Sequence, residues 1–142
     1  MNHTTFQPTD DQLVDPHATA DHRSYAMLMH LTALAHLFIP GFAIAIPIIM
    51  WQVKKNDSPF IDDHGREVTN FQITLLIYSF LLPALAAIVG VITCGVGFLL
   101  LPIVGFIPYI LGLIGMVYAA MAANRGAYYR YPMTIRFIPS PA

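Results

Sequence analysis

Two long stretches of this chain contain no charged side chain, and this feature limits its fold more than any other. Residues 24–53 and residues 68–124 contain no Asp, Glu, Lys or Arg. Only 11% of the 142 residues are charged, against about 25% in an ordinary soluble domain. A soluble protein of this size needs polar groups over most of its surface. We therefore expect a small membrane protein and not a soluble globular domain.

The lengths of the two uncharged windows predict how often the chain crosses a membrane. A crossing helix needs about 20 mainly apolar residues. The first window holds 30 residues, enough for one crossing, and the second holds 57, enough for two crossings with a turn between them. The glycines of residues 93–97 favour a turn at that point. The predicted fold is an all-α integral membrane helical bundle with about three transmembrane helices, at about 24–53, 70–93 and 98–124.

The first predicted helix contains a break signal. Pro40 and Gly41 lie near the middle of the window, and proline removes a backbone donor and clashes with the preceding turn. A straight helix over the whole window would be about 45 Å long, more than a ~30 Å hydrocarbon core. We expect a kink near Pro40. If the window is instead a split hairpin, the chain has four crossings.

The positions of the basic residues predict an orientation. With three crossings, the loop 54–69 and the C-terminal segment 125–138 share one side, and the N-terminus lies on the other. The first side holds six of the seven basic residues, Lys54, Lys55, Arg66, Arg125, Arg130 and Arg136, and the second holds Arg23. By the positive-inside rule the loop and the C-terminus are cytoplasmic and the N-terminus is outside. The four-crossing alternative moves the N-terminus inside.

The two ends of the chain differ in composition. Residues 1–23 are acidic and contain two prolines, a composition that predicts a disordered tail. Residues 125–138 mix tyrosines with arginines, which suits a segment at the level of the lipid headgroups. The bundle itself is therefore expected within residues 24–138.

The residues that could perform catalysis or bind a metal do not form a convincing set. His30 and His36 are six residues apart, a spacing that places them on different faces of a helix. His64 and Glu67 form an H-x-x-E pair, but helical di-metal sites also need further carboxylates inside the bundle. The single cysteine, Cys94, excludes a disulfide framework. We predict no catalytic residue, no metal site and no cofactor.

Composition and spacing also indicate the partners. A formal net charge of -1 argues against nucleic acid, whose binding needs a basic face. Small residues at every fourth position, as at Gly115, Ala119 and Ala123, let helices pack closely. The expected partners are therefore the lipid bilayer and either further copies of the chain or other membrane proteins.

Several short motifs stand out beside these general features. They are His36 in the first helix, Pro47 and Trp51 towards its end, Ser58 and Pro59 in the loop, an H-G-x-E-x-x-N-F-Q stretch with His64, Glu67, Asn70, Phe71 and Gln72, and a G-x-x-Y-R-Y-P stretch with Gly126, Tyr129, Arg130, Tyr131 and Pro132. We regard these residues as candidate family-motif or interaction residues. Their combination resembles the small bacterial Tic20-like (DUF4870) multi-pass membrane proteins.

The resemblance covers residues 24–138 and implies a bacterial cytoplasmic membrane. It also implies a distant relation to protein translocation machinery. We expect a non-enzymatic assembly or interaction component. The alternative is a small-solute or ion transporter or pore that acts as an oligomer, because the prolines within the windows could produce the broken helices that transporters use.

Overall fold

The chain folds into helices, as predicted. The computed structural model describes residues 13–39 and 41–139, and within these ranges a single isolated β-bridge joins Val14 to Ala127. The helical elements are α1 (Ala20–Thr32), η1 (Ala33–Leu37), η2 (Phe42–Ile44), α2 (Ala45–Lys54), α3 (Pro59–Ile92), η3 (Val96–Leu100) and α4 (Leu101–Asn124), where η denotes a 3₁₀ helix.

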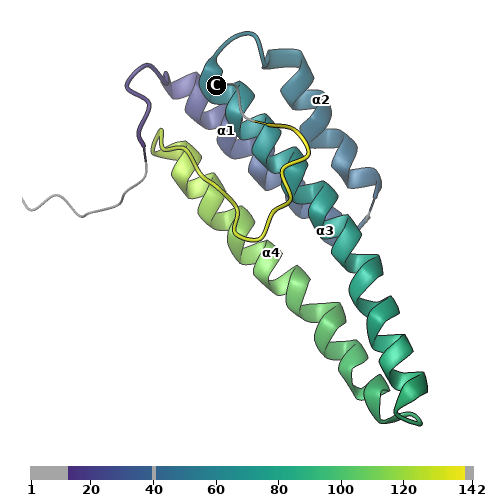
Figure 1. The fold of residues 1–142 in the computed structure, drawn as a ribbon. Helices are drawn as coiled ribbons and strands as arrows, with labels where there is room; N and C mark the ends of the chain where they lie inside the picture. Colours follow the sequence, from purple (N-terminus) through teal and green to yellow (C-terminus); the bar gives the residue numbers. More distant parts are fainter. Residues whose placement is uncertain (1–12, 40, 140–142) are drawn as a thin grey trace, which may run out of the picture.

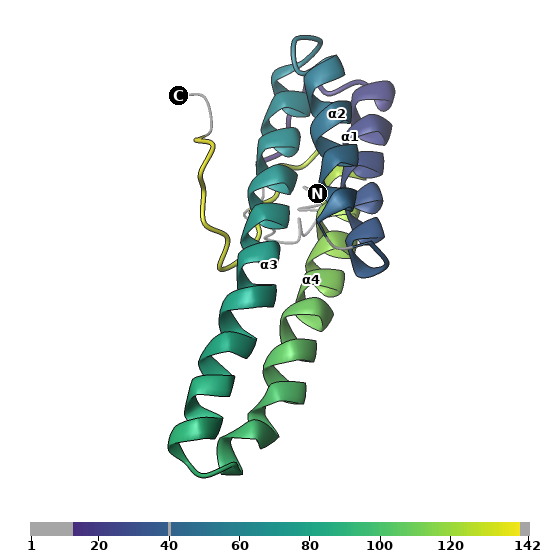
Figure 2. The same cartoon turned by 90° about the vertical axis from the view of Figure 1, so that its right-hand side faces the viewer.

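The helices differ strongly in length, and this gives the molecule two unlike ends. α3 has 34 residues and α4 has 24, whereas α1 has 13 and α2 has 10. α1 and α2 lie beside the first half of α3 and the last half of α4, and the rest of α3 and α4 continues alone (Figures 1 and 2). We call this two-helix part, residues 79–108, the arm, and the remaining described residues the head.

The structure divides the first predicted helix, 24–53, into two short antiparallel helices (Figure 2). α1 is about 20 Å long and α2 about 15 Å, so neither spans a ~30 Å hydrocarbon core. Gly41 has a φ of 84°, in a region that glycine adopts without strain, and Pro40 lies outside the described residues. The first window is therefore split as in the four-crossing alternative, but into pieces shorter than a crossing.

The second predicted helix begins earlier than expected, so the predicted loop 54–69 is largely helical. Ser58 caps α3, because its side chain accepts a hydrogen bond from the backbone N–H of Phe60 at 3.2 Å, and Pro59 follows in the first turn. Both residue types are favoured at these positions. The connection between α2 and α3 is only residues 55–58.

The predicted disordered tail, 1–23, lies partly outside the described residues, which begin at residue 13. In the described part, the backbone N–H of Asp15 donates to the carbonyl of Gly126 at 2.9 Å. α1 begins at Ala20, and the Thr19 side chain accepts a hydrogen bond from the N–H of His22 at 3.2 Å. The end of this tail is therefore part of the head.

Small residues let α1 and α4 pack closely. Ala26, Met29 and Ala33 on one side are buried with Met116, Ala119 and Ala123 on the other. At the far end of the arm, the turn after α3 uses Gly95 at a φ of 102°. Side chains on the arm are mostly exposed, and α3 and the segment Val96–Asn124 are both long and apolar enough to cross a membrane.

Candidate functional site

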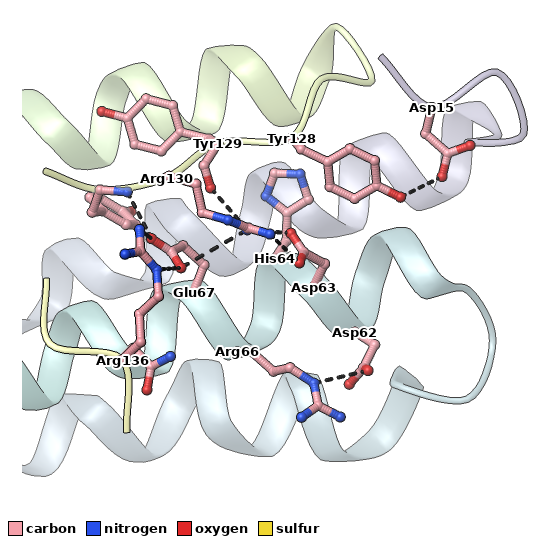
Figure 3. A network of polar contacts seen from close by, with 12 residues as sticks. Asp15, Asp62, Asp63, His64, Arg66, Glu67, Tyr128, Tyr129, Arg130 and Arg136 are labelled. Carbon is pink, nitrogen blue, oxygen red and sulfur yellow. Dashed lines mark hydrogen bonds and ion pairs between the residues drawn. The ribbon is translucent and has the colours of Figure 1, made fainter. Parts of the chain in front are cut away.

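A stripe of polar side chains on α3 forms the most concentrated polar site in the described structure. Because residues three and four apart share one face of a helix, this stripe runs along α3 from the head to the edge of the arm. It faces residues 128–139, which we call the C-terminal strap (Figure 3). The stripe consists of Asp63, Glu67, Asn70, Thr74 and Tyr78.

Two carboxylates at the start of the stripe hold the arginines of the strap. Arg130 binds Asp63 in a bidentate pair, with N–O distances of 2.6 and 2.7 Å, and this contact raises the Arg130 pKa. Glu67 is 2% exposed, accepts a hydrogen bond from the Tyr131 N–H at 2.8 Å and lies 3.5 Å from Arg136 Nε. The buried carboxylates are thus neutralised by the strap, and such charges are stable only when paired.

The remaining members of the stripe bind the strap backbone. The Asn70 side chain accepts from the N–H of Ile138 at 2.9 Å and donates to its carbonyl at 2.8 Å. Further along α3, the Thr74 hydroxyl accepts from the N–H of Ile135 at 3.0 Å, and the Tyr78 hydroxyl donates to the carbonyl of Met133 at 3.2 Å. These contacts satisfy backbone groups in a segment whose residues form neither a helix nor a strand.

A second buried group of polar side chains joins α1, α3 and the strap. His30 Nδ1 lies 2.9 Å from the Tyr131 hydroxyl, and His30 Nε2 lies 2.8 Å from His64 Nδ1. Burial lowers the pKa of His64 to about 4 and holds the pKa of His30 well below its ordinary value. Burial also raises the Tyr131 pKa. The chain of hydrogen bonds therefore connects neutral groups at neutral pH.

The far ring nitrogen of His64 points towards the start of the strap. His64 Nε2 is buried without a hydrogen bond of ordinary geometry, although the nearby carbonyl of Ala127 slightly raises the His64 pKa. The Tyr128 ring stacks on His64, and its hydroxyl donates to Asp15 at 2.9 Å (Figure 3). Burial and this carboxylate together raise the pKa of Tyr128 to about 12. The N-terminal segment is fixed to the strap in this way.

The chemistry open to this site is restricted. Each buried carboxylate is paired with arginine, and each buried imidazole of the cluster is hydrogen-bonded to another side chain. Among the described residues, no group of three or more His, Cys, Asp or Glu side chains converges as metal ligands. The arrangement is suited to joining α1, α3 and the strap into one rigid head.

The structure brings most of the predicted motif residues together. Buried in the head are His36, Pro47, Trp51, Ser58, His64, Glu67, Asn70, Phe71, Gln72, Gly126 and Tyr131, whereas Pro59, Tyr129, Arg130 and Pro132 are at least partly exposed. The two motif blocks, H-G-x-E-x-x-N-F-Q and Y-R-Y-P, are the two sides of one interface, since Phe71 stacks on Tyr131 at 4.0 Å between ring centroids. His36 lies apart from the histidine pair, beside Tyr109.

Sequence reasoning missed several partners in this interface. Asp63, Thr74 and Tyr78 bind the strap, and His30 completes the buried cluster. The spacing of polar residues at 63, 67, 70, 74 and 78 was visible as one helix face. Nothing in the sequence indicated that His30 and His64 meet.

Comparison with known proteins identifies a family. Residues 21–138 match the magnetosome magnetite crystal formation protein family (MamF/MmsF). No curated protein and no solved structure matches the chain. The resemblance to the Tic20-like (DUF4870) family was therefore wrong, because this match covers the whole of the stretch on which it rested. The motifs behind it hold a strap against a helix. The relation to translocation and the transporter alternative lose their support.

Proposed function

The chain belongs to the magnetosome magnetite crystal formation protein family, and from this membership we propose that it is a non-enzymatic membrane component of magnetite crystal formation. It works as an assembly or interaction protein, anchored in the bacterial membrane that surrounds the crystal. The observation that carries this proposal is the family match over residues 21–138, supported by two helical segments, α3 and Val96–Asn124, that are long and apolar enough to cross a membrane.

The division between arm and head supports a membrane position. The arm contains no Asp, Glu, Lys or Arg, and its large side chains are exposed, as for Phe80 at 73% and Leu99 at 74%. The run 73–92 is about 30 Å long as a helix, equal to a hydrocarbon core. In our proposal the membrane therefore surrounds the arm and the adjoining turns of α3 and α4, and the rest of the head lies at one surface, which is the cytoplasmic surface by the positive-inside rule.

The head supports an interaction role more than a catalytic one. Its buried polar groups are used to join its own segments, as described for Asp63, Glu67 and the histidine pair. A rigid head held at a membrane surface presents a fixed set of exposed side chains to partners, either copies of the chain or other membrane proteins. Non-enzymatic assembly is the activity that such an architecture serves.

The test is deletion and complementation in a magnetite-forming bacterium. We expect loss of the protein to change the size or shape of the crystals in electron micrographs, and the tagged chain to co-fractionate with the membranes around them and resist alkaline extraction. Normal crystals after deletion would remove the role in crystal formation. Extraction of the chain by alkali would separately remove the membrane position.

A further inference from the structure

An apolar groove lies between the two long helices and the C-terminal strap. Its cavity volume is about 620 Å³, within the ~300–1,000 Å³ of typical small-molecule sites. One wall is α3 between Phe71 and Leu82, and the other is α4 between Ile107 and Tyr118. The strap closes one end of it, at the level where the strap crosses the two helices (Figure 1).

The groove changes in polarity along its length. The end near the strap carries hydroxyl groups, among them those of Thr74, Tyr129 and Thr134, whereas the end towards the arm is lined by Leu82, Ile107 and Pro108. The Thr134 hydroxyl is buried and has no hydrogen-bond partner among the described residues. A buried hydroxyl without a hydrogen-bond partner lowers the stability of the fold. A ligand with a polar group at this end of the groove would supply that partner.

The dimensions of the groove favour a particular occupant. The stretch from Phe71 to Leu82 is about 16 Å long along the helix, roughly half of a ~30 Å hydrocarbon core and thus the depth of one leaflet. A single extended hydrocarbon chain has the length and the narrow cross-section that a groove of this kind accommodates.

The surface around the groove supports the same occupant. Ile107, Leu111 and Ile114 line the groove and remain 48%, 58% and 47% exposed. The groove is therefore continuous with the apolar surface of the arm, which faces lipid in the proposed membrane position. Its hydroxyl-bearing end lies next to the charged head, at the depth where the ester groups of a phospholipid meet the hydrocarbon core.

We propose that this groove binds one acyl chain of a glycerophospholipid from the leaflet on the head side, with the Thr134 hydroxyl donating to an ester carbonyl of that lipid. This inference rests on the proposed membrane position of the arm. The groove would then be a specific lipid-binding site, whereas the rest of the arm surface contacts lipids without selecting among them.

The experiment uses the full chain in nanodiscs that contain a phospholipid with a photoactivatable diazirine on one acyl chain. Crosslinked residues are mapped by mass spectrometry. Leu82→Trp fills the groove, and Leu81→Trp is its control, because Leu81 is 47% exposed but does not line the groove. Thr134→Val removes the hydroxyl at nearly constant volume.

We expect crosslinks to concentrate on the groove residues of the wild type. Leu82→Trp should lower this yield about tenfold, which corresponds to ~1.4 kcal/mol, and Leu81→Trp should leave it unchanged. Thr134→Val should lower it by a smaller factor, and added free fatty acid should not compete. Crosslinks spread evenly over the arm, or an equal yield in both Trp variants, would overturn the proposal.

The same samples separate this proposal from the membrane position on which it rests. Crosslinks on the arm outside the groove report insertion, whatever happens in the groove. An arm without any crosslink would therefore contradict the proposed membrane position itself. Crosslinks on the arm that avoid the groove would contradict the lipid site alone.

Discussion

Two buried imidazoles, those of His30 and His64, lie 2.8 Å apart between nitrogen atoms. Two positive charges at this distance in the interior of the head would repel one another and would lack solvent. Both rings are therefore neutral, and one ring donates where the other accepts. Protonation of the accepting ring replaces this hydrogen bond with two opposing donors, and protonation of the donating ring places a buried charge beside it.

This pair makes the stability of the head depend on pH. The folded-state pKa of His64 is about 4, below the ordinary value of 6.5, so the unfolded chain binds more protons between these two values. The contribution to stability is complete above pH 6.5 and is lost as the pH falls towards 4. For His64 alone it amounts to about 3 kcal/mol. We expect the unfolding temperature in mild detergent to fall over this window.

Two variants isolate the source of this pH dependence. His64→Gln should flatten the slope of unfolding temperature between pH 6.5 and pH 4, even if it lowers the temperature itself. His17→Gln, at an exposed residue, should keep the wild-type slope. Equal slopes in wild type and His64→Gln would show that the buried pair does not titrate as the structure indicates.

At the scale of single residues, the sequence marked the site but not its contacts. His64, Glu67, Asn70 and the Tyr-Arg-Tyr-Pro block were all selected as motif residues. Their pairing could not be read, because it depends on the strap turning back along α3, and a strap without regular structure leaves no periodic pattern. Which residues contact one another depends on how the strap aligns with α3, and this alignment cannot be read from the sequence alone.

At the scale of elements, the contact of α2 with α3 depends on one glycine. A Cβ on Gly65 would overlap the Trp51 side chain at its root, which includes Cβ at 2.7 Å. Trp51 is also held by a hydrogen bond from Nε1 to Asp62 at 2.7 Å. The ring therefore cannot move aside without displacing α2.

Alanine at two glycines should have opposite effects. Gly65→Ala should destabilise the head by ~1–3 kcal/mol, because overpacking forces neighbouring atoms to shift. Gly105→Ala lies in α4, where a Cβ meets nothing within 4 Å, and should stabilise that helix by ~0.5–1 kcal/mol. Thermal unfolding in one detergent measures both. If Gly105→Ala lowered the stability as much as Gly65→Ala does, the overlap with Trp51 would not explain the destabilisation at Gly65.

The attachment of the strap to α3 depends in part on the single side chain of Asn70. Asn70→Ala removes two hydrogen bonds to Ile138, of 2.8 and 2.9 Å, and should cost ~1–3 kcal/mol. Amide hydrogen exchange at residues 135–138 should become faster. Ser79→Ala is the control, because Ser79 donates only to Leu75 of its own helix. Unchanged exchange in Asn70→Ala would show that the strap is held elsewhere.

Helix types and a break near residue 40 were predictable from the sequence, whereas the start of α3 was not placed correctly. The apolar runs near 73–92 and 98–123 indicated helices, and the structure has helices there. The charged stretch before residue 70 was interpreted as a loop, because charge was used to mark the end of the membrane. Helix and membrane need not end at the same residue, and the Ser58-Pro59 start signal describes the helix more directly.

At the scale of the whole molecule, every described charged residue belongs to the head. The arm contains none, and α1 and α2 return to the end from which α1 starts (Figure 2). Arg23 therefore lies near the other basic residues, because its side chain is beside Gly126, where an added Cβ would lie 3.2 Å from Arg23 Cδ. In the proposed membrane position, the six-to-one distribution expected from three crossings becomes a distribution of all seven basic residues on one side, with both ends of the described residues in the head.

This arrangement predicts a topology with two crossings. The sole cysteine, Cys94, is exposed at the end of the arm. In the proposed membrane position it lies on the side opposite the head. When the chain is produced in the cytoplasmic membrane, a membrane-impermeant maleimide should label Cys94 in intact spheroplasts and not in sealed inside-out vesicles.

Two cysteine variants on a Cys94→Ala background complete the prediction. Asn56→Cys, between α2 and α3, and Asp21→Cys, at the start of α1, should both react only in inside-out vesicles, because α1 and α2 are too short to cross. The three-crossing arrangement requires instead that residues 21 and 56 react on opposite sides. Labelling of residue 21 in spheroplasts would therefore contradict the two-crossing topology, and labelling of residues 56 and 94 from one side would contradict the crossing of the arm itself.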